Sequence, residues 1–376
     1  MAKLIVLKKE TYEEYVSTYA LNPHFSQSSF WSEIIKKEND DTVYYLALLN
    51  KDNMIIAATT LFSKTLSNHT YFYAPAGFIL DYSDEDTVKK MTKAVAKFIK
   101  KRKGLFLFID PMISKSDINN IQTLRSLGFK QNDFSKAINR QSKIYTSINL
   151  MDDFSSISNE NTNKANFFKV KIKIDDKKDS TPYNKELFQE LNKNNMATLF
   201  SAHINLDYIL ERLNTSSKEI KNQLSILPID NLSKSAKNKF TELKKQQSII
   251  SEDIKKFTEH KTNYGENISL NSMMIVHYKD KAWLLKRASH KDVNEPYIND
   301  YLYNEMLKHL SNMGIKEYFE LKDDYNFMSS FNTKQIKYTD NFIYITNHTK
   351  YFIYNKLLPW YRKKKNKVTK EVDHDS

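Results

Sequence analysis

Two runs of apolar residues with heptad-like spacing lie in the middle of the chain. The first run has spacings of 7, 4 and 3 residues between Leu213, Ile220, Leu224 and Leu227. The second run alternates spacings of 3 and 4 residues through Phe240, Leu243, Gln247, Ile250, Ile254 and Phe257. Pro228 and the polar stretch 230–235 separate the two runs. The pattern predicts an antiparallel two-helix coiled-coil arm, with helices of about 20 residues and roughly 30 Å.

Residues 1–145 alternate between strand-like and helix-like patterns. The expected strands are 4–7, 42–49, 54–63, 71–73 and 105–109, and the expected helices are 11–19, 29–37, 84–103 and 118–127. The strands at 42–49 and 54–63 should pair antiparallel across the turn at Asn50–Asn53. Thr11 and Glu14 have the spacing of a capping box, and Gly128 is suited to end the last helix.

The second half of the chain repeats this outline, with the arm inserted in it. Its expected strands are 147–150, 170–174, 268–277, 281–288, 317–321 and 341–347, and its expected helices are 151–169, 184–195, 296–313 and 349–367. The fold class is therefore α/β (α+β). We expect a first domain at 1–145, a second at 146–207 and 265–348, the arm at 208–264, and a basic aromatic helix and tail at 349–376.

The composition narrows the kinds of partner. The 376 residues carry a formal charge of +13, which suits a polyanion such as nucleic acid or anionic lipid. An AT-rich genome, which enriches lysine, asparagine and isoleucine, explains the same charge equally well. The chain has no cysteine, which excludes disulfides and thiolate chemistry. No stretch approaches 18 apolar residues, so we expect a cytoplasmic protein, with contact to a membrane surface left open.

Glycine is scarce, and this excludes several nucleotide and coenzyme sites. The 5 glycines are scattered at Gly77, Gly104, Gly128, Gly265 and Gly314. A P-loop, a Rossmann fingerprint and the pyrophosphate loop of a CoA-dependent acetyltransferase all need clustered glycines near phosphate. The 9 histidines show no metal-ligand spacing. We therefore expect neither a cofactor nor a metal, and chemistry based on hydroxyls, carboxylates, amines and positioning.

Two segments of the first domain carry candidate chemistry. The segment 71–78 ends a strand in a tight turn, in which Pro75 and Gly77 follow Tyr73. The apolar strand 105–109 stops abruptly at Asp110-Pro111. Active sites in α/β proteins form at such strand ends. From the pattern alone, the favoured reading is that Asp110 caps a turn, since Asp-Pro is common in turns.

Taken together, the motifs of this chain resemble the Fem family. These aminoacyltransferases build the interpeptide bridges of peptidoglycan. The resemblance rests on the Tyr-x-Pro-x-Gly turn at 73–77, the strand end at Asp110, the upstream Gln27-Ser28-Ser29-Phe30-Trp31, the segments 141–150 and 161–170, the inserted hairpin, and the helix 297–306 before Gly314. It covers nearly the whole chain, in order.

The resemblance implies two GNAT-like domains, the second carrying the hairpin, and no metal or CoA. It implies transfer of an amino acid from aminoacyl-tRNA to the side-chain amine of the stem-peptide lysine. The acceptor would be lipid II or its nucleotide form, UDP-MurNAc-pentapeptide. Homologous partner enzymes are a further expectation.

Three departures from the family pattern fall on substrate-contacting positions. Ala76 and Phe78 replace an arginine and a second proline in the turn, and Ile35 stands where the family has a lysine, with Lys36 beside it. The stretch 331–334 lacks the glycines usual there, with Asn332 in their place. The alternative function is therefore a catalytically weakened relative that binds tRNA or cell-wall precursor, or supports active relatives.

For an aminoacyl ester attacked by an amine, the resemblance suggests these roles. Asp110 would orient or deprotonate the amine, and Lys334, or Lys337 in its place, would stabilise the oxyanion. Lys36 would pair with acceptor phosphates, while Trp31 and Tyr73 would contact the sugar or peptide. A solvated surface charge is the competing reading for each lysine.

Two basic regions would meet large partners. The arm would follow the tRNA backbone through Lys244, Lys245, Lys255 and Lys256, or these are ordinary solvated lysines of a helical hairpin. The final helix combines aromatic residues with the cluster Arg362–Lys365. It suits an anionic membrane surface, or it packs on the core with a frayed basic end.

Overall fold

In the computed structural model, the described residues are 2–20, 23–39, 41–66, 69–131, 144–151, 159–175, 185–227, 234–293, 295–321 and 333–352. The chain divides into two compact units. The first comprises Met1–Ser147, Glu320–Asp324 and Lys334–Ser376, and the second comprises Ile148–Phe319 and Tyr325–Thr333. Within the described ranges, no helix combines the length and apolar character needed to cross a bilayer.

The first sheet has seven strands in the order β1-β2-β3-β4-β5-β14-β6. Their bounds are β1 Lys3–Val6, β2 Thr42–Leu49, β3 Ile55–Leu66, β4 His69–Ala74, β5 Phe106–Ile109, β14 Phe342–Ile345 and β6 Phe129–Gln131. Strands β1 to β4 pair antiparallel, and β4 and β5 run parallel. The predicted antiparallel pair across Asn50–Asn53 is confirmed.

The helices of the first unit are α1 Lys9–Thr18, the short 3-10 helix η1 Phe25–Gln27, α2 Ser29–Asn39, α3 Glu85–Lys101, α4 Ile118–Ser126 and α10 His348–Phe352. Helix α3 buries Val88, Met91, Val95 and Ile99, whose 3- and 4-residue spacing predicted an amphipathic helix. Asp84 caps it by accepting from the Thr87 N–H. The predicted cap at Thr11 is wrong, because α1 already begins at Lys9, after Lys8.

Strand β14 corrects the predicted grouping of residues 265–348 into one domain. It lies in the first sheet, between β5 and β6, with Phe342 opposite both Ile109 and Gln131. The side chain of Phe342 is fully buried, in the core of the first unit. Burial of this apolar strand end explains the pairing, which no local pattern specifies. The other predicted domain boundaries stay predictions.

The second sheet also has seven strands, in the order β13-β7-β12-β11-β10-β9-β8. Their bounds are β13 Thr333–Lys337, β7 Ile144–Asn149, β12 Glu317–Leu321, β11 Lys281–Ser289, β10 Asn267–Tyr278, β9 Ala197–Asn205 and β8 Lys171–Ile174. Strands β8 to β11 pair antiparallel, and β11 and β12 run parallel. The predicted pair of β10 and β11 is confirmed, whereas strands β6, β9 and β13 were missed.

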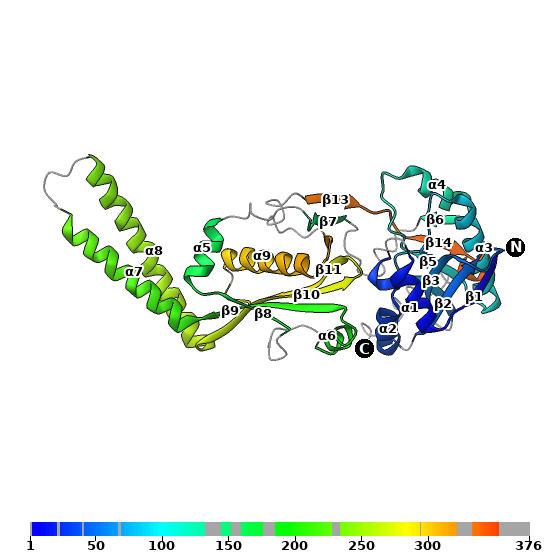
Figure 1. Ribbon diagram of the computed structural model, residues 1–376, viewed down its shortest axis with the longest axis horizontal. Helices are drawn as coiled ribbons and strands as arrows, with labels where there is room; N and C mark the ends of the chain where they lie inside the picture. Colours follow the sequence, from blue (N-terminus) through cyan, green and yellow to red (C-terminus); the bar gives the residue numbers. More distant parts are fainter. Residues whose placement is uncertain are drawn as a thin grey trace, which may run out of the picture. The chain divides into compact units, whose positions relative to one another are not determined.

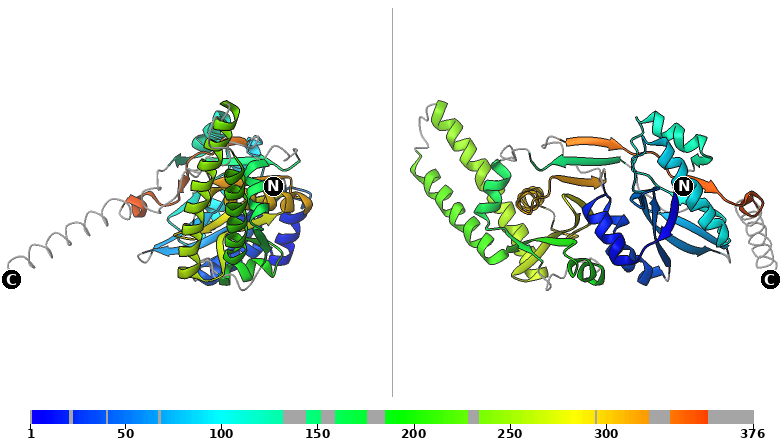
Figure 2. Two further views of the ribbon diagram at one scale, coloured as in Figure 1. Left: turned by 90° about the vertical axis from the view of Figure 1, so that its left-hand side faces the viewer. Right: turned by 45° about the vertical axis from the view of Figure 1, so that its right-hand side comes forward.

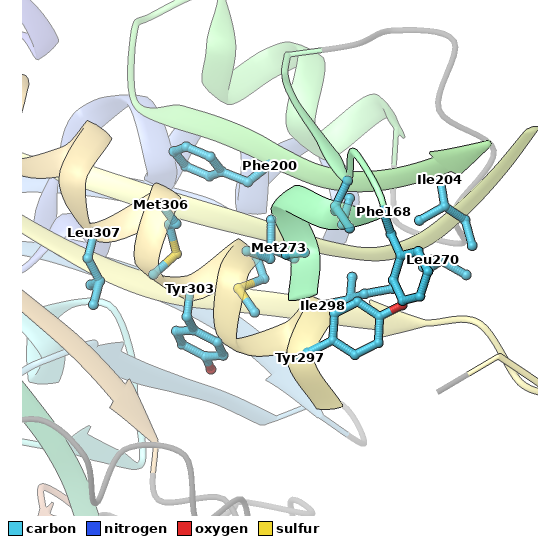
Figure 3. Packing of buried hydrophobic residues seen from close by; sticks show 14 of the residues in the cluster. Phe168, Phe200, Ile204, Leu270, Met273, Tyr297, Ile298, Tyr303, Met306 and Leu307 are labelled. Carbon is cyan, nitrogen blue, oxygen red and sulfur yellow. The ribbon is translucent and has the colours of Figure 1, made fainter. Parts of the chain in front are cut away.

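Helix α9 Pro296–Asn312 covers the core of the second unit, together with α5 Asn159–Phe167. Figure 3 shows Tyr303, Met306 and Leu307 of this helix near Phe200 and Met273 of the sheet. All five side chains are fully buried. A further helix, α6 Lys185–Asn192, joins β8 to β9 and contributes Phe188 and Leu191 to the buried residues.

The two sheets repeat one pattern of connections. Each begins with four antiparallel strands, then has a helix, and then adds a strand parallel to the fourth: β4–α3–β5 in the first sheet and β11–α9–β12 in the second. The connection between the second and third strands differs. It is the short turn at 50–54 in the first sheet, and the whole helical hairpin in the second.

The hairpin consists of α7 Leu206–Ile226 and α8 Lys234–Tyr264, which lie side by side (Figures 1 and 2). The residues of the predicted seam on α8 are buried or half-buried, namely Phe240, Leu243, Gln247, Ile250, Ile254 and Phe257. The hairpin prediction is thus confirmed, and a coiled-coil supercoil stays a prediction. The separating residues 228–233 and the tail from 353 onward lie outside the described residues.

Phe257 offers a test of how the hairpin is anchored. Its side chain is 2% exposed, and its ring centroid lies 6.1 Å from that of Phe168 in the second core. We expect Phe257→Ala to lower the free energy of unfolding of the second unit by about 3–5 kcal/mol, because it leaves a cavity between the hairpin and the domain. Urea denaturation followed by circular dichroism measures the change.

Ile249→Ala is the control on the same helix, since Ile249 is 49% exposed. Its effect should stay within about 0.5 kcal/mol. Equal effects of the two substitutions would contradict the anchoring role of Phe257.

Candidate functional site

The candidate site lies where strands β4 and β5 end. These strands are parallel and in register, with Ala74 opposite Ile109. The next residues of both strands therefore reach the same edge of the sheet. One strand continues into the turn at Pro75–Gly77, and the other into Asp110. The two motifs found in the sequence thus become neighbours.

The turn after β4 has an unusual backbone. The Gly77 N–H donates to the Ala74 carbonyl at 3.2 Å, and Ala76 and Gly77 have φ of +55° and +79°. A positive φ at the third residue marks a type II turn, in which glycine or asparagine is usual. A Cβ on Gly77 would lie 2.5 Å from the Tyr82 hydroxyl and 2.9 Å from the Pro111 Cα. The glycine is therefore required by both conformation and space.

Asp110 ties this turn to the preceding strand. Its Oδ1 accepts from the Ala76 N–H at 2.7 Å, and its Oδ2 accepts from the Tyr73 hydroxyl at 3.0 Å. The Asp110 side chain is half-buried. Asp110 therefore does cap a turn, but this turn lies 34 residues away in the sequence, whereas the predicted turn was the one at Asp110-Pro111. A half-buried carboxylate at a sheet edge keeps the potential for proton transfer.

Tyr82 closes the buried side of the turn. Its hydroxyl accepts from the Phe78 N–H at 2.9 Å. Burial raises the pKa of Tyr82, the hydrogen bond from Phe78 opposes the rise in pKa, and the negative charge of Asp110 adds to it. Tyr82 is therefore held neutral beside the carboxylate.

Gln27 holds the turn from a third segment of the chain. Its Nε2 donates to the carbonyls of Pro75 and, at 3.0 Å, of Gly77. Its Oε1 accepts from the Thr60 N–H at 2.7 Å, within β3. The side chain is 1% exposed. One buried amide thus joins η1, β3 and the turn that Asp110 caps.

Helix α2, which carries the predicted residues Trp31 and Lys36, begins directly after Gln27 and Ser28. Trp31 is half-buried, and its ring centroid lies 4.9 Å from that of Phe25. Lys36 is exposed, with its Nζ 3.5 Å from the Glu33 carboxylate. Glu33 also accepts from the Tyr45 hydroxyl at 3.0 Å. Lys36 is therefore a loosely paired cation on a helix whose start is fixed to the turn.

Lys334 lies on β13, with an exposed side chain. The following residues run antiparallel to the loop after β5: Lys337 accepts from the Lys115 N–H at 2.7 Å, and Thr339 donates to Ile113 at 2.8 Å. Among the described contacts, none joins the Lys334 side chain to the Asp110 site, so only Tyr73 and Asp110 of the predicted residues meet.

The four predicted arm lysines are exposed on α8. Lys256 forms an ion pair with Glu295, whose carboxylate side chain is only 9% exposed. Lys244 lies over the ring of Phe240, with its Nζ 5.8 Å from the ring centroid. Lys256 therefore also has a structural role, in connecting the hairpin to the start of α9.

Gln27 and Tyr82 were not singled out from the sequence as contributors to this site. Gln27 was named only as part of the motif before Trp31. A polar residue between Ser26 and Ser28 gives no local sign of burial, since the partners of its side chain lie 15 to 50 positions away. Tyr82 follows a loop with no periodicity that would place its ring.

Two sheets that each place a strand parallel to the last of four antiparallel strands, joined in one chain, define a tandem GNAT-like fold. A crystal structure of FemX aligns with a TM-score of 0.67 at 16% identity, covering 93% of this chain and 99% of FemX. A tandem GNAT protein from the clavulanic acid biosynthesis pathway aligns with a TM-score of 0.50 at 6% identity, over 92% of this chain and 99% of that one. The predicted GNAT-like fold is confirmed.

The sequence comparisons find relatives in the same family. The model of the FemAB family matches residues 7–140. Aminoacyltransferase FemA of Staphylococcus epidermidis is 21% identical over 89% of this chain and 94% of its own length. Lipid II:glycine glycyltransferase of Staphylococcus haemolyticus is 24% identical over 66% of this chain and 68% of its own length. The resemblance to the Fem family is therefore confirmed, and the relatives of this chain are aminoacyltransferases.

Gln27→Leu tests whether the buried amide supports the site. The substitution keeps the volume but leaves the Thr60 N–H and the Pro75 carbonyl without their side-chain partner. We expect it to lower the free energy of unfolding of the first unit by about 2–4 kcal/mol, from the cost of unpaired buried polar groups. Chemical denaturation measures this change.

The matched control is Gln246→Leu on α8, where the exposed amide bonds only to Glu242 in its own helix. Its effect should remain within about 0.5 kcal/mol. A Gln27→Leu protein as stable as the control would show that the three segments are held by other contacts.

Proposed function

We propose that this protein transfers an amino acid from aminoacyl-tRNA to the side-chain amine of the stem-peptide lysine of a peptidoglycan precursor. The acceptor is lipid II or UDP-MurNAc-pentapeptide, and the product extends an interpeptide bridge. The single observation that carries the proposal is the half-buried Asp110 carboxylate, fixed at the sheet edge by Tyr73 and Ala76. The aminoacyltransferase relatives support the reaction class.

The chemistry needs little more than positioning and one proton acceptor. The acceptor amine attacks the ester carbon of the aminoacyl-tRNA, a C–N bond forms, and the ribose oxygen leaves with the electron pair of the broken C–O bond. Esters are activated already, so orientation supplies much of the rate. Asp110 would bind the ammonium form and accept its proton as the amine attacks. The proton would finally reach the ribose oxygen.

The acceptor would approach along α2. Lys36 is exposed enough to pair with a phosphate of the precursor, and its weak contact with Glu33 is easily exchanged for one. Trp31 and Tyr73 would provide surfaces for the sugar and peptide.

The proposed role of Lys36 predicts that Lys36→Gln raises KM for the precursor with little change in kcat. A kcat effect alone would argue against phosphate binding by Lys36.

Lys334 is proposed as the cation that stabilises the oxyanion. Among the described contacts none joins Lys334 to Asp110, so in this proposal Lys334 acts on the substrate directly rather than through Asp110. If it fills this role, Lys334→Gln should lower kcat by about 100-fold. Lys337→Gln is the comparison, because the backbone of Lys337 pairs with the loop after Asp110 through the Lys115 N–H. An unchanged rate for Lys334→Gln removes it from the mechanism.

The donor tRNA would lie along the hairpin. Lys244, Lys245 and Lys255 are exposed on α8, and no acidic side chain in the described part of the chain forms an ion pair with them. Lysine side chains bind the phosphates of a nucleic acid through their charge, and this contact does not depend on the base sequence. The C-terminal helix is proposed to meet the anionic membrane surface on which lipid II resides.

The residues of the turn after β4 support a second candidate function. Ala76 and Phe78 stand where the family has arginine and proline, and Phe78 is 3% exposed, so neither side chain supplies a charge to a substrate. The alternative is a relative with weakened catalysis that binds tRNA or precursor, or supports active homologues.

Incubation with mixed charged tRNAs and lipid II, followed by mass spectrometry of the lipid, separates the two functions. A gain of one amino-acid residue supports transfer, and an unmodified lipid supports the alternative.

Asp110→Asn should lower kcat for transfer by about 100-fold or more, because the amide cannot accept the proton. The amide oxygen can still accept from the Ala76 N–H, so we expect little change in the melting temperature. Single-turnover transfer with charged tRNA and lipid II measures the rate.

Asp86→Asn is the control, since Asp86 is an exposed carboxylate in the first turn of α3. It should leave the rate unchanged. If Asp110→Asn folds normally and transfers at the full rate, Asp110 has no part in the chemistry.

Substitution of the hairpin lysines tests the tRNA contact. We expect the triple variant Lys244→Gln, Lys245→Gln, Lys255→Gln to weaken tRNA binding about tenfold at low salt. The slope of the logarithm of the binding constant against the logarithm of the salt concentration should become less steep by about two to three. Lys256 is kept, because its pair with Glu295 is structural. Filter binding across a salt series measures both effects.

The control removes the same charge from the first unit, through the exposed residues Lys3, Lys8 and Lys103. This variant should bind tRNA nearly as well as the unmodified protein. Equal losses in the two triple variants would mean that tRNA responds only to net charge, and would refute a specific role for the hairpin.

A further inference from the structure

A groove in the first unit lies apart from every residue of the Asp110 site. It has a volume of about 910 Å³ and lies along α3, beside β1 and the turn between β2 and β3. Figure 1 shows these elements at one side of the first sheet. None of its lining residues has a role in the proposed transfer.

The floor of the groove is apolar. It is formed by side chains from both the sheet and the helix, namely Leu4, Leu48, Ile56, Ala94 and Phe98. Four of these are half-buried, and only Leu48 is fully buried. The floor therefore leaves apolar surface open to whatever enters the groove.

The rim is strongly basic. Six cationic side chains line the groove, namely Lys51, Lys90, Lys93, Lys97, Lys101 and Arg102, against the single acid Asp52. Lys90 pairs with Asp86. Among the described ion pairs, none involves Lys93, Lys97 or Lys101.

The spacing of these lysines concentrates the charge on one face of α3. Lys93, Lys97 and Lys101 are four residues apart, so they stand one above another along the helix. Like charges at this spacing destabilise a helix. Together with the open apolar floor, this unbalanced charge points to a ligand that supplies both negative charge and apolar surface.

A nucleic acid fits the groove less well than a lipid. The sole aromatic side chain in its lining is Phe98, and the Arg102 guanidinium covers the Phe98 ring at 3.6 Å from the centroid. The edge of Tyr44 packs at 5.2 Å from the same ring. The ring is thus already engaged, although base stacking is what single-stranded nucleic acids need from an aromatic side chain.

We propose that this groove, rimmed by Lys93 and Lys97 over the floor at Ile56 and Ala94, is a docking site for the anionic phospholipids of a membrane surface. The lysines bind the phosphate groups, and the first methylene groups of an acyl chain cover the apolar floor. The proposal uses no residue of the C-terminal segment 349–376 and does not depend on the proposed transfer reaction.

The test compares two double variants of the full chain. Lys93→Gln with Lys97→Gln removes two rim charges. Lys8→Gln with Lys130→Gln removes two exposed charges from the same unit, on segments that do not line the groove. Binding is measured by co-sedimentation with phosphatidylcholine vesicles, with and without 30% phosphatidylglycerol as about a physiological fraction of anionic lipid.

We expect binding only to the anionic vesicles. The rim variant should lose about 30-fold in partition coefficient, from about fivefold for each lysine near an anionic surface. The control variant should lose less than about threefold, since its lysines do not face the bound lipid. Equal losses for both variants would overturn the proposal, as would binding that neither variant affects.

A second measurement locates the contact without relying on affinity. The chain has no cysteine, so Ala94→Cys can be labelled at one position with an environment-sensitive fluorophore. Anionic vesicles should shift its emission to the blue, and should not shift that of a label at Lys130→Cys, which lies outside the groove. A shift of neither label, or of both equally, contradicts docking through the groove.

Total tRNA provides the competing outcome. If the rim variant loses affinity for tRNA and keeps its affinity for anionic vesicles, the groove is a nucleic-acid site and the lipid proposal is wrong. Loss of transfer activity plays no part in this test, so its result and that of the transfer assay are independent.

Discussion

The candidate site depends on one buried amide, that of Gln27. Its donor end holds two carbonyls of the turn after β4, and its acceptor end holds an N–H of β3. A buried amide that leaves its bonds unmade costs free energy, so these three segments can only come together in one arrangement. The next residues of the chain begin α2, which carries Trp31 and Lys36. The same side chain therefore fixes both the turn that Asp110 caps and the start of the helix expected to meet the acceptor.

A second constraint acts on the hairpin. It replaces a short turn between two antiparallel strands, so its two ends must leave the sheet as neighbours. The Leu206 N–H donates to the Glu266 carbonyl at 2.8 Å, and Asn205 caps α7 by accepting from the Tyr208 N–H at 2.8 Å. Leu213 and Phe257 then belong to the core of the domain. The base of the hairpin is thus part of the domain, whereas its outer portion has only its own seam.

Much of this fold was predictable, for reasons that differ between elements. Helix α3 and the pair β10–β11 have clear periodicity, because each has one buried face. Strand β9 was missed because its residues 197–202 are all buried, so the sequence shows no alternation. The placement of β14 depends on burial of Phe342 against residues more than 200 positions away. In the candidate site, Asp110 and Tyr73 could be predicted because both stand at strand ends. Gln27 could not be predicted, because the partners of its side chain are distant in the sequence.

The geometry of Ala76 separates the scaffold of the site from its substrate contacts. The residue is held with φ of +55°, a conformation that costs an alanine roughly 1 kcal/mol. Its N–H, rather than its side chain, meets the Asp110 carboxylate at 2.7 Å. An arginine at this position would therefore make the same backbone bond, and its replacement by alanine leaves the turn and Asp110 in place. What changes is the charge that the turn presents to a substrate. Backbone groups and buried side chains thus hold Asp110 in place. The charges that recognise the acceptor have to come from residues outside the turn.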